Sequence, residues 1–98
     1  MTKAYLIGHI TVTNPEGYAR YASRVPATIE AAGGRYLVRG GHATQLEGQG
    51  LGIRQVVLEF PSRAAAEAWY ASEAYQAILP DRTNNAIGSL VLVDGYSA

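Results

Sequence analysis

The segment 90–93, Leu-Val-Leu-Val, has an apolar side chain at every position. Successive side chains of a β-strand point to opposite faces of its sheet, so such a strand presents apolar groups to both faces. The same holds for Leu6 beside Ile7 and for Val57 beside Leu58. A half-exposed antiparallel sheet alternates apolar with polar residues instead. The chain must therefore form a sheet that needs a cover on each face.

Residues 14–34 carry the signals of one long helix. Asn14 is a suitable N-cap, and Pro15 fits the first helical position. Pro26 lacks the N–H that a helix interior uses, which predicts a kink or a break just before it. The glycines at 33–34 predict the end of the helix. An apolar stripe at steps of three and four residues comprises Tyr18, Tyr21, Ala22, Val25, Ile29 and Ala32.

Glycine, proline and serine mark the bounds of the remaining elements. Strands are predicted at 5–12, 35–39, 54–60 and 90–93, and further helices at 64–71 and 73–79, each preceded by a capping serine. The glycines at 40–41 predict a bulge or bend, beyond which 42–47 is a candidate continuation of the strand. Residues 48–52 are interpreted as a flexible turn and 80–88 as a polar connection.

This order of elements is the split βαβ pattern of an α+β, ferredoxin-like βαββαβ fold. It predicts a four-stranded antiparallel sheet with strand order 4-1-3-2 and both helices of the pattern on one face. The other face is then bare and apolar, and such a patch usually marks an interface. We expect a second copy to cover it, giving a homodimer through the sheet. The alternative is a monomer whose bare face is only mildly apolar.

Composition excludes several classes of protein. The 98 residues suit one domain, spanning 1–98. Eight Lys+Arg balance eight Asp+Glu, which leaves no general basic surface for nucleic acid or an anionic membrane. No cysteine is present, so disulfides and thiolate catalysis are excluded. No apolar run approaches the roughly 20 residues of a membrane span. We expect a cytoplasmic protein without nucleic-acid or membrane partners.

Three parts of the chain together resemble a known family. They are 33–41, Gly-Gly-Arg-Tyr-Leu-Val-Arg-Gly-Gly; 57–62, Val-Leu-Glu-Phe-Pro-Ser; and Tyr75-Gln76 followed by Arg82. They resemble the domain-of-unknown-function family 1330 (DUF1330), over nearly the whole chain. One departure is Ser-Glu-Ala-Tyr-Gln at 72–76, where the family tends to have Ser-Pro-Glu-Tyr-Gln.

The resemblance implies the dimeric α+β barrel superfamily, in which two ferredoxin-like sheets close face to face. Relatives there include cofactor-independent monooxygenases, isomerases and haem-binding enzymes, and the fold alone does not choose among these activities. The family has no agreed activity, so no catalytic residue is carried over from it.

Three ionisable residues are candidates for acid–base chemistry on one face of the sheet. If odd-numbered residues share a face on each strand, His9, Arg39 and Glu59 converge there. His9 would shuttle a proton, while Arg39 would hold an anionic group. The alternative is a cross-strand ion pair between Glu59 and Arg39, with His9 hydrogen-bonded nearby.

Substrate-binding candidates lie near the third helix. Arg82, expected in a loop, suits a carboxylate, or else pairs with an acidic neighbour at the surface. Trp69 and Tyr75 are core residues or line a ligand pocket. His42 is a solvated loop residue or a second acid–base group or haem ligand. His9 and His42 follow no metal-ligand spacing, and we expect neither a metal nor a cofactor.

Two functions remain open at this point. The first is a homodimeric enzyme acting without a cofactor, by proton transfer, oxygenation or isomerisation, on a small, partly apolar, anionic molecule. The second is a non-catalytic module that binds a small ligand or responds to stress. An enzyme needs a pocket of a few hundred Å³ with polar groups converging on it. A module without a ligand site predicts a filled interior whose polar groups satisfy one another.

Overall fold

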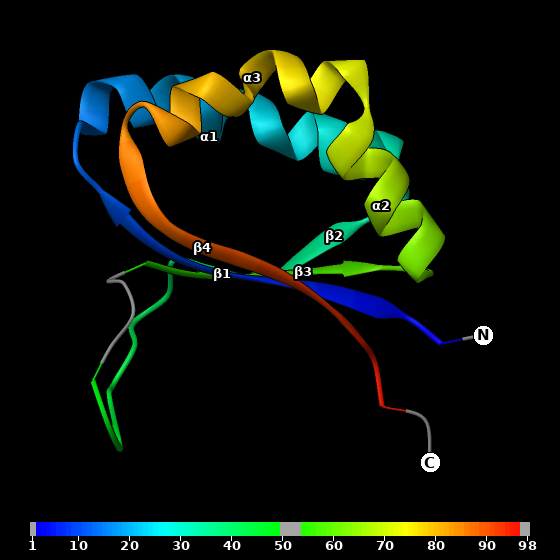
Figure 1. Ribbon diagram of the computed structural model, residues 1–98, viewed down its shortest axis with the longest axis horizontal. Helices are drawn as coiled ribbons and strands as arrows, with labels where there is room; N and C mark the ends of the chain where they lie inside the picture. The colour runs from blue at the N-terminus through cyan, green and yellow to red at the C-terminus, as the bar shows by residue number, and fades with distance from the viewer. Residues whose placement is uncertain (1, 50–53, 97–98) are drawn as a thin grey trace.

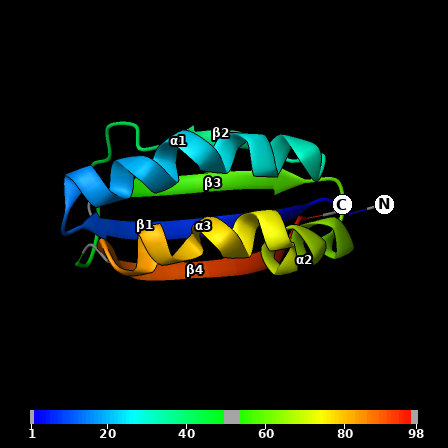
Figure 2. The ribbon, with the colours of Figure 1, turned by 90° about the horizontal axis from the view of Figure 1, so that it is seen from above.

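The computed structural model describes residues 2–49 and 54–96. The elements are β1 (Ala4–Val12), α1 (Pro15–Ala31), β2 (Arg35–Arg39), β3 (Arg54–Phe60), α2 (Arg63–Ala71), α3 (Glu73–Thr83) and β4 (Ala86–Asp94). All pairs of neighbouring strands are antiparallel, in the order β2-β3-β1-β4. The helices lie together on one face of this sheet (Figures 1 and 2). The predicted α+β class, strand order and layering are confirmed.

The first helix begins and ends where the sequence predicts. Asn14 occupies the N-cap position, and its backbone carbonyl accepts from Tyr18 N–H, but its side chain makes no capping bond. Gly33 has a φ of 81°, a left-handed conformation that glycine adopts without a side-chain clash. Gly34 N–H then donates to the carbonyl of Ile29, which satisfies one of the last helical carbonyls.

The predicted break at Pro26 is wrong, because α1 runs through it as one helix. In a regular helix the N–H of residue 26 would donate to the carbonyl of Ala22, and proline has no N–H to give. Arg39 of β2 supplies the missing donor, since its Nη2 donates to the Ala22 carbonyl at 2.6 Å. A strand side chain thus completes the helix at its interruption.

Serine caps begin the other two helices as predicted. Ser62 Oγ accepts from Ala65 N–H, and Ser72 Oγ accepts from Tyr75 N–H. The third helix does not stop at residue 79, however, but includes Pro80 and ends at Thr83. Segment 80–83 is therefore helical rather than a polar connection, and β4 begins at residue 86 instead of 90.

The chain leaves the sheet after β2. Gly40 has a φ of 68°, and its N–H donates to the carbonyl of Gln55, which closes the last rung of the β2–β3 pair. Residues 41–46 form neither helix nor strand, so the candidate continuation of the strand over 42–47 is wrong. Figure 1 shows this loop hanging on the side of the sheet opposite the helices. Of the predicted turn at 48–52, residues 50–52 lie outside the described residues.

The two faces of the sheet differ in their cover. The helix-covered face and the helices form the core, whose largest fully buried side chains are Trp69, Tyr75, Phe60 and Ile29. On the other face, Ile7 lies between Val57 and Val91 in the strand register, which makes an apolar row across three strands. Val91 is 54% exposed there and Ile87 is 66% exposed. The bare apolar face is present as predicted, while its cover by a second copy stays a prediction.

Candidate functional site

A cavity of about 40 Å³ lies between the sheet and the helices, smaller than the few hundred Å³ expected of an enzyme pocket. Residues of all four strands form its floor, and residues of all three helices form its roof. Most of its lining is aliphatic or aromatic. Such a mainly apolar pocket with a few polar groups is the usual form of a small-molecule site.

Gly8 of β1 leaves space above the floor of this cavity because it has no side chain. It is buried between Leu6 and Ile10 on the helix-covered face, and all the remaining β1 residues on that face have a side chain. A Cβ at Gly8 would meet Leu90 Cδ1 at 3.4 Å and Val56 Cβ at 3.7 Å. The backbone of Gly8 is not in the left-handed region. The glycine is therefore explained by the space that it leaves above the strand and not by the conformation of its backbone.

Three arginines from different elements line the cavity: Arg39 of β2, Arg54 of β3 and Arg82 of α3. No Asp, Glu or His lines it within the described residues. Each guanidinium lies over a tyrosine ring, with Arg39 4.7 Å from the centroid of Tyr36. The site is consequently cationic and aromatic, a combination that favours an anion with a flat or apolar body.

The three guanidinium groups differ in how they are satisfied. Arg39 donates to the carbonyl of Ala22, as described above. Arg54 lies 5.8 Å from the centroid of the Tyr18 ring, and its buried Nε has no hydrogen-bond partner among the described residues. The Nε of Arg82 is likewise buried without a partner there. Two Nε–H donors are thus buried beside a cationic cavity without a partner among the described residues.

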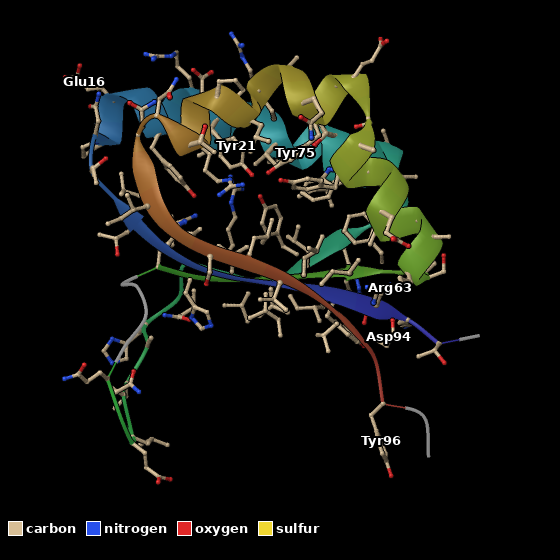
Figure 3. The ribbon with its side chains drawn as sticks, viewed as in Figure 1. Glu16, Tyr21, Arg63, Tyr75, Asp94 and Tyr96 are labelled. Atoms are coloured by element: carbon tan, nitrogen blue, oxygen red, sulfur yellow. The ribbon has the colours of Figure 1, made fainter. Side chains whose placement is uncertain are left out.

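A pair of tyrosines stands beside Arg82. The hydroxyls of Tyr21 and Tyr75 lie 2.9 Å apart, and the guanidinium of Arg82 lies 5.9 Å from the centroid of the Tyr21 ring. Figure 3 shows Tyr21 and Tyr75 meeting between the helices and the sheet. Burial raises the pKa of Tyr21, as does the neighbouring Tyr75, so its hydroxyl stays neutral at physiological pH. A neutral hydroxyl can still donate a hydrogen bond to an anion.

The predicted cluster of His9, Arg39 and Glu59 does not form. His9 and Glu59 lie on the bare face, whereas Arg39 lies on the helix-covered face. The register of β2 shifts between Tyr36 and Val38, where the strand carries an extra residue. A β-bulge of this kind inverts the alternation of all later side chains, which carries Arg39 to the other face.

Glu59 has other partners than the predicted Arg39. Its carboxylate accepts from Arg35 Nε at 2.9 Å and from Tyr5 Oη at 3.1 Å, and Lys3 Nζ lies 3.6 Å away. The hydrogen bond from Arg35 holds the pKa of Glu59 below its usual value, against the opposing effect of desolvation. The alternative ion pair with Arg39 is therefore wrong in its partner, although Glu59 is paired.

Neither histidine lines the cavity. His9 is half-buried on the bare face, between Gln55 and Ser89 in the register, and its Nδ1 has no hydrogen-bond partner among the described residues. His42 is exposed in the loop after β2, with Thr44 Oγ1 3.4 Å from its Nε2. Residues 2–49 and 54–96 contain no group of three or more His, Asp or Glu placed to hold a metal ion.

The predicted substrate-binding residues lie together at the cavity. Trp69 lines it, and its Nε1 donates to Thr28 Oγ1 at 3.0 Å. Tyr75 is fully buried behind it, with ring centroids 4.1 Å apart. Arg82 also lines the cavity, but it stands in the last turn of α3 and not in a loop. A helix holds its guanidinium more firmly than a loop would.

Sequence reasoning missed Arg54 and Gly8. Both are exceptions to the apolar pattern of the strand residues that face the helices. Arg54 lies two residues before Val56 and four before Leu58, so it shares their helix-covered face. An arginine in that phase at the end of a strand is a signal for a polar group that faces inward. Gly8 is the corresponding exception in β1.

Comparison with known proteins gives a family and a fold. A protein of unknown function, RPA0582 from Rhodopseudomonas palustris, has a TM-score of 0.77 and 17% identity, covering 99% of this chain and 83% of that one. SnoaB, a cofactor-independent oxygenase from Streptomyces nogalater, has a TM-score of 0.67 and 10% identity, covering 100% and 97%. A NIPSNAP domain protein from Burkholderia xenovorans has a TM-score of 0.60 and 20% identity, covering 100% and 95%.

At these identities the structural matches show the fold alone. Among proteins with curated functions, none matches this chain. Within the described residues, no helix combines the length and the apolar character that crossing a membrane requires. The family described as "Domain of unknown function (DUF1330)" matches residues 3–96, and the chain belongs to that family.

Proposed function

We propose that the protein binds a small carboxylate with an apolar body in the cavity between its helices and its sheet. The observation that carries this proposal is the pair of buried Nε–H donors, on Arg54 and Arg82, that have no partner among the described residues. A buried polar group without a partner costs about 1–3 kcal/mol, so native proteins seldom leave one unless a ligand or water takes it.

The chemistry of the lining supports a carboxylate in particular. A guanidinium presents its N–H groups as a planar fork that matches the two oxygens of a carboxylate. With no Asp, Glu or His among the described lining residues, nothing there neutralises the arginines. The aromatic and aliphatic walls then accept the rest of the ligand.

The test is a calorimetric titration of benzoate, with the uncharged isostere benzamide as comparison. Benzoate is expected to bind at least tenfold more tightly, because only the anion engages the guanidinium groups. Arg54→Gln and Arg82→Gln should each weaken benzoate binding at least tenfold. Arg24→Gln is the matched control, since Arg24 is exposed on α1 and does not line the cavity.

Two results would refute the carboxylate site. One is equal affinity for benzoate and benzamide, which would mean that the charge is not recognised. The other is an equal loss of binding in the Arg24 control, which would mean that benzoate only follows net charge. A circular dichroism spectrum of each variant verifies that the fold is retained.

We also propose that the functional form is a homodimer built through the bare sheet face. The row of Val57, Ile7 and Val91 lies at the centre of that face. Exposed apolar patches of this kind on a sheet are usually covered by a partner, and a second copy supplies a complementary surface by two-fold symmetry. A cytoplasmic location stays a prediction, which cell fractionation can check.

A catalytic role is the second candidate, and His9 is the residue that favours it. Its Nδ1 is buried without a partner on the bare face, so in the proposed dimer it would lie inside the paired sheets. Glu59 and Arg39 have partners that account for them structurally. If His9 transfers protons, His9→Ala should abolish turnover of a bound substrate and leave the dimer intact. Unchanged turnover would remove His9 from consideration.

A further inference from the structure

A second hollow adjoins the arginine-lined cavity. It is an open groove between α2 and β4, of about 740 Å³ including the solvent that it opens onto. Its walls are Leu6, Leu90 and Leu92 from the sheet and Ala66, Glu67 and Tyr70 from α2. Five of these six residues are apolar or aromatic, and Tyr70 is 41% exposed. The groove thus offers an apolar surface that the chain itself does not cover.

The groove and the cavity meet at Leu90, which lines both. Leu90 is half-buried, and it stands opposite Gly8 in the strand register, where no side chain rises from the floor. A Cβ at Gly8 would contact Leu90 Cδ1 at 3.4 Å, so the glycine leaves Leu90 room beside it. The two hollows therefore adjoin each other, with the Leu90 side chain between them.

The cavity and the groove differ in the charge of the residues that line them. Arg54 and Arg82, with their buried unpartnered Nε groups, stand at the cavity end. At the groove end stands Glu67 of α2, whose partner Arg63 lies 3.8 Å away. Arg63 is already engaged by Asp94 at 3.0 Å, and Figure 3 shows these two side chains together at the edge of the sheet. An anionic head is attracted to the cavity and repelled from the groove.

We propose that the ligand is a carboxylate with an unbranched apolar tail, whose head lies on Arg54 and Arg82 and whose tail passes Leu90 into the groove. This inference rests on the carboxylate site proposed above. Leu90 and Leu92 stand two residues apart on β4, about 7 Å along the strand. The groove accordingly suits a flexible chain of several methylenes more than a second ring.

A series of straight-chain acids tests the tail directly by calorimetry: butanoate, hexanoate, octanoate and decanoate. Each methylene buried in the groove is expected to tighten the dissociation constant about fourfold. Octylamine and octan-1-ol keep the tail and remove the carboxylate, and both should bind at least tenfold more weakly than octanoate.

A variant that fills the groove separates the tail from the head. Leu92→Phe adds bulk where the groove is open to solvent, and it should weaken octanoate at least tenfold while leaving butanoate unchanged. Tyr70→Ala removes a partly exposed wall whose ring also packs on Trp69 and Tyr75, and it should weaken octanoate severalfold. Ala68→Phe is the control, because Ala68 is exposed on α2 and does not line the groove.

The outcomes distinguish the two proposals. If affinity is flat across the series but is lost in Arg54→Gln, the carboxylate site stands and the tail assignment is wrong. If octan-1-ol binds as tightly as octanoate and Leu92→Phe weakens both, the groove binds apolar chains and the proposed head group is wrong. Binding of benzoate but of none of these acids would overturn the tail assignment alone, and binding of neither would overturn both proposals.

Discussion

At the scale of single residues, the arginines of this protein differ in whether every buried N–H donor of the side chain has a partner. Arg39 completes helix α1, and Arg35 pairs with Glu59. Arg54 and Arg82 keep a buried donor unpaired among the described residues. Groups that stabilise the fold are expected to find partners within it, whereas groups kept for a ligand leave a cost in the empty protein.

Arg54→Met is expected to stabilise the unliganded protein by about 1 kcal/mol, because it removes a partly buried donor that lacks a partner while keeping an apolar stem in the cavity. Urea denaturation monitored by circular dichroism measures the change. The same variant should lose benzoate binding. A loss of stability of 1 kcal/mol or more would indicate that Arg54 is a structural residue with an essential contact in the fold.

Glu59 gives a pH prediction whose sign follows from its partners. The hydrogen bond from Arg35 lowers the pKa of Glu59 from its ordinary value of 4.5 in the folded chain. A carboxyl with a lowered pKa contributes stability above its unfolded pKa, and this contribution is lost as the pH falls through the folded pKa. Glu59→Gln should therefore lower stability at neutral pH and flatten its decline below about pH 4.5. Thermal melting between neutral and acidic pH tests this, and parallel curves for both proteins would contradict it.

At the scale of elements, the notable contact joins β2 to α1 at its proline. The Ala22 carbonyl loses its helical donor to Pro26 and regains one from Arg39. Ala22 and Arg39 both line the cavity, so the contact also ties the helix roof to the sheet floor. Helix α1 and strand β2 are consequently joined by one hydrogen bond. It satisfies the carbonyl that Pro26 leaves without a donor.

Arg39→Ala should destabilise the protein by about 1–3 kcal/mol, because it leaves the Ala22 carbonyl without a donor. Pro26→Ala restores the backbone N–H to that carbonyl and should make the loss of Arg39 less harmful. A double-mutant cycle by urea denaturation measures this coupling, which should be at least 0.5 kcal/mol. Strict additivity would show that the hydrogen bond does not compensate for the proline.

At the scale of the whole molecule, the sheet has a cavity on its helix-covered face and apolar side chains without a cover on its other face. Tyr21, Tyr75 and Trp69 fix the cavity side by stacking and hydrogen bonding. The opposite face carries Ile87, Val91 and Val93 exposed, with no helix over it. The proposed dimer would cover that face and leave the cavity of each copy open at its own helices.

Val91→Lys tests the dimer, because a charge in the apolar row is costly to bury. Wild-type protein is expected to sediment at twice the 10.5 kDa of one chain at micromolar concentration, and the variant as a monomer. Ala68→Lys, on the exposed face of α2, should remain dimeric. A monomeric wild type would contradict the dimer, whatever the variant does.

The fold could be predicted from the sequence because its signals are local. Two-sided apolar strands, Ser62 and Ser72 as caps, and Gly33 as the helix end each act within a few residues. The site could be predicted only in part, since it depends on register. One extra residue between Tyr36 and Val38 turned Arg39 to the other face, and Pro80 failed to stop α3, which placed Arg82 on a helix. Neither event has a signature that sequence periodicity detects.

The proposed carboxylate site depends most on anion binding by the buried Nε–H groups of Arg54 and Arg82. Side-chain NMR observes these groups directly. In a ¹⁵N-labelled sample titrated with benzoate, their Nε–Hε signals, assigned by Arg54→Gln and Arg82→Gln, are expected to shift downfield and saturate together as hydrogen bonds to the carboxylate form. The signal of the control residue Arg24 should stay in place. If the Arg54 and Arg82 signals do not move while benzoate is present at saturating concentration, the cavity is not a carboxylate site.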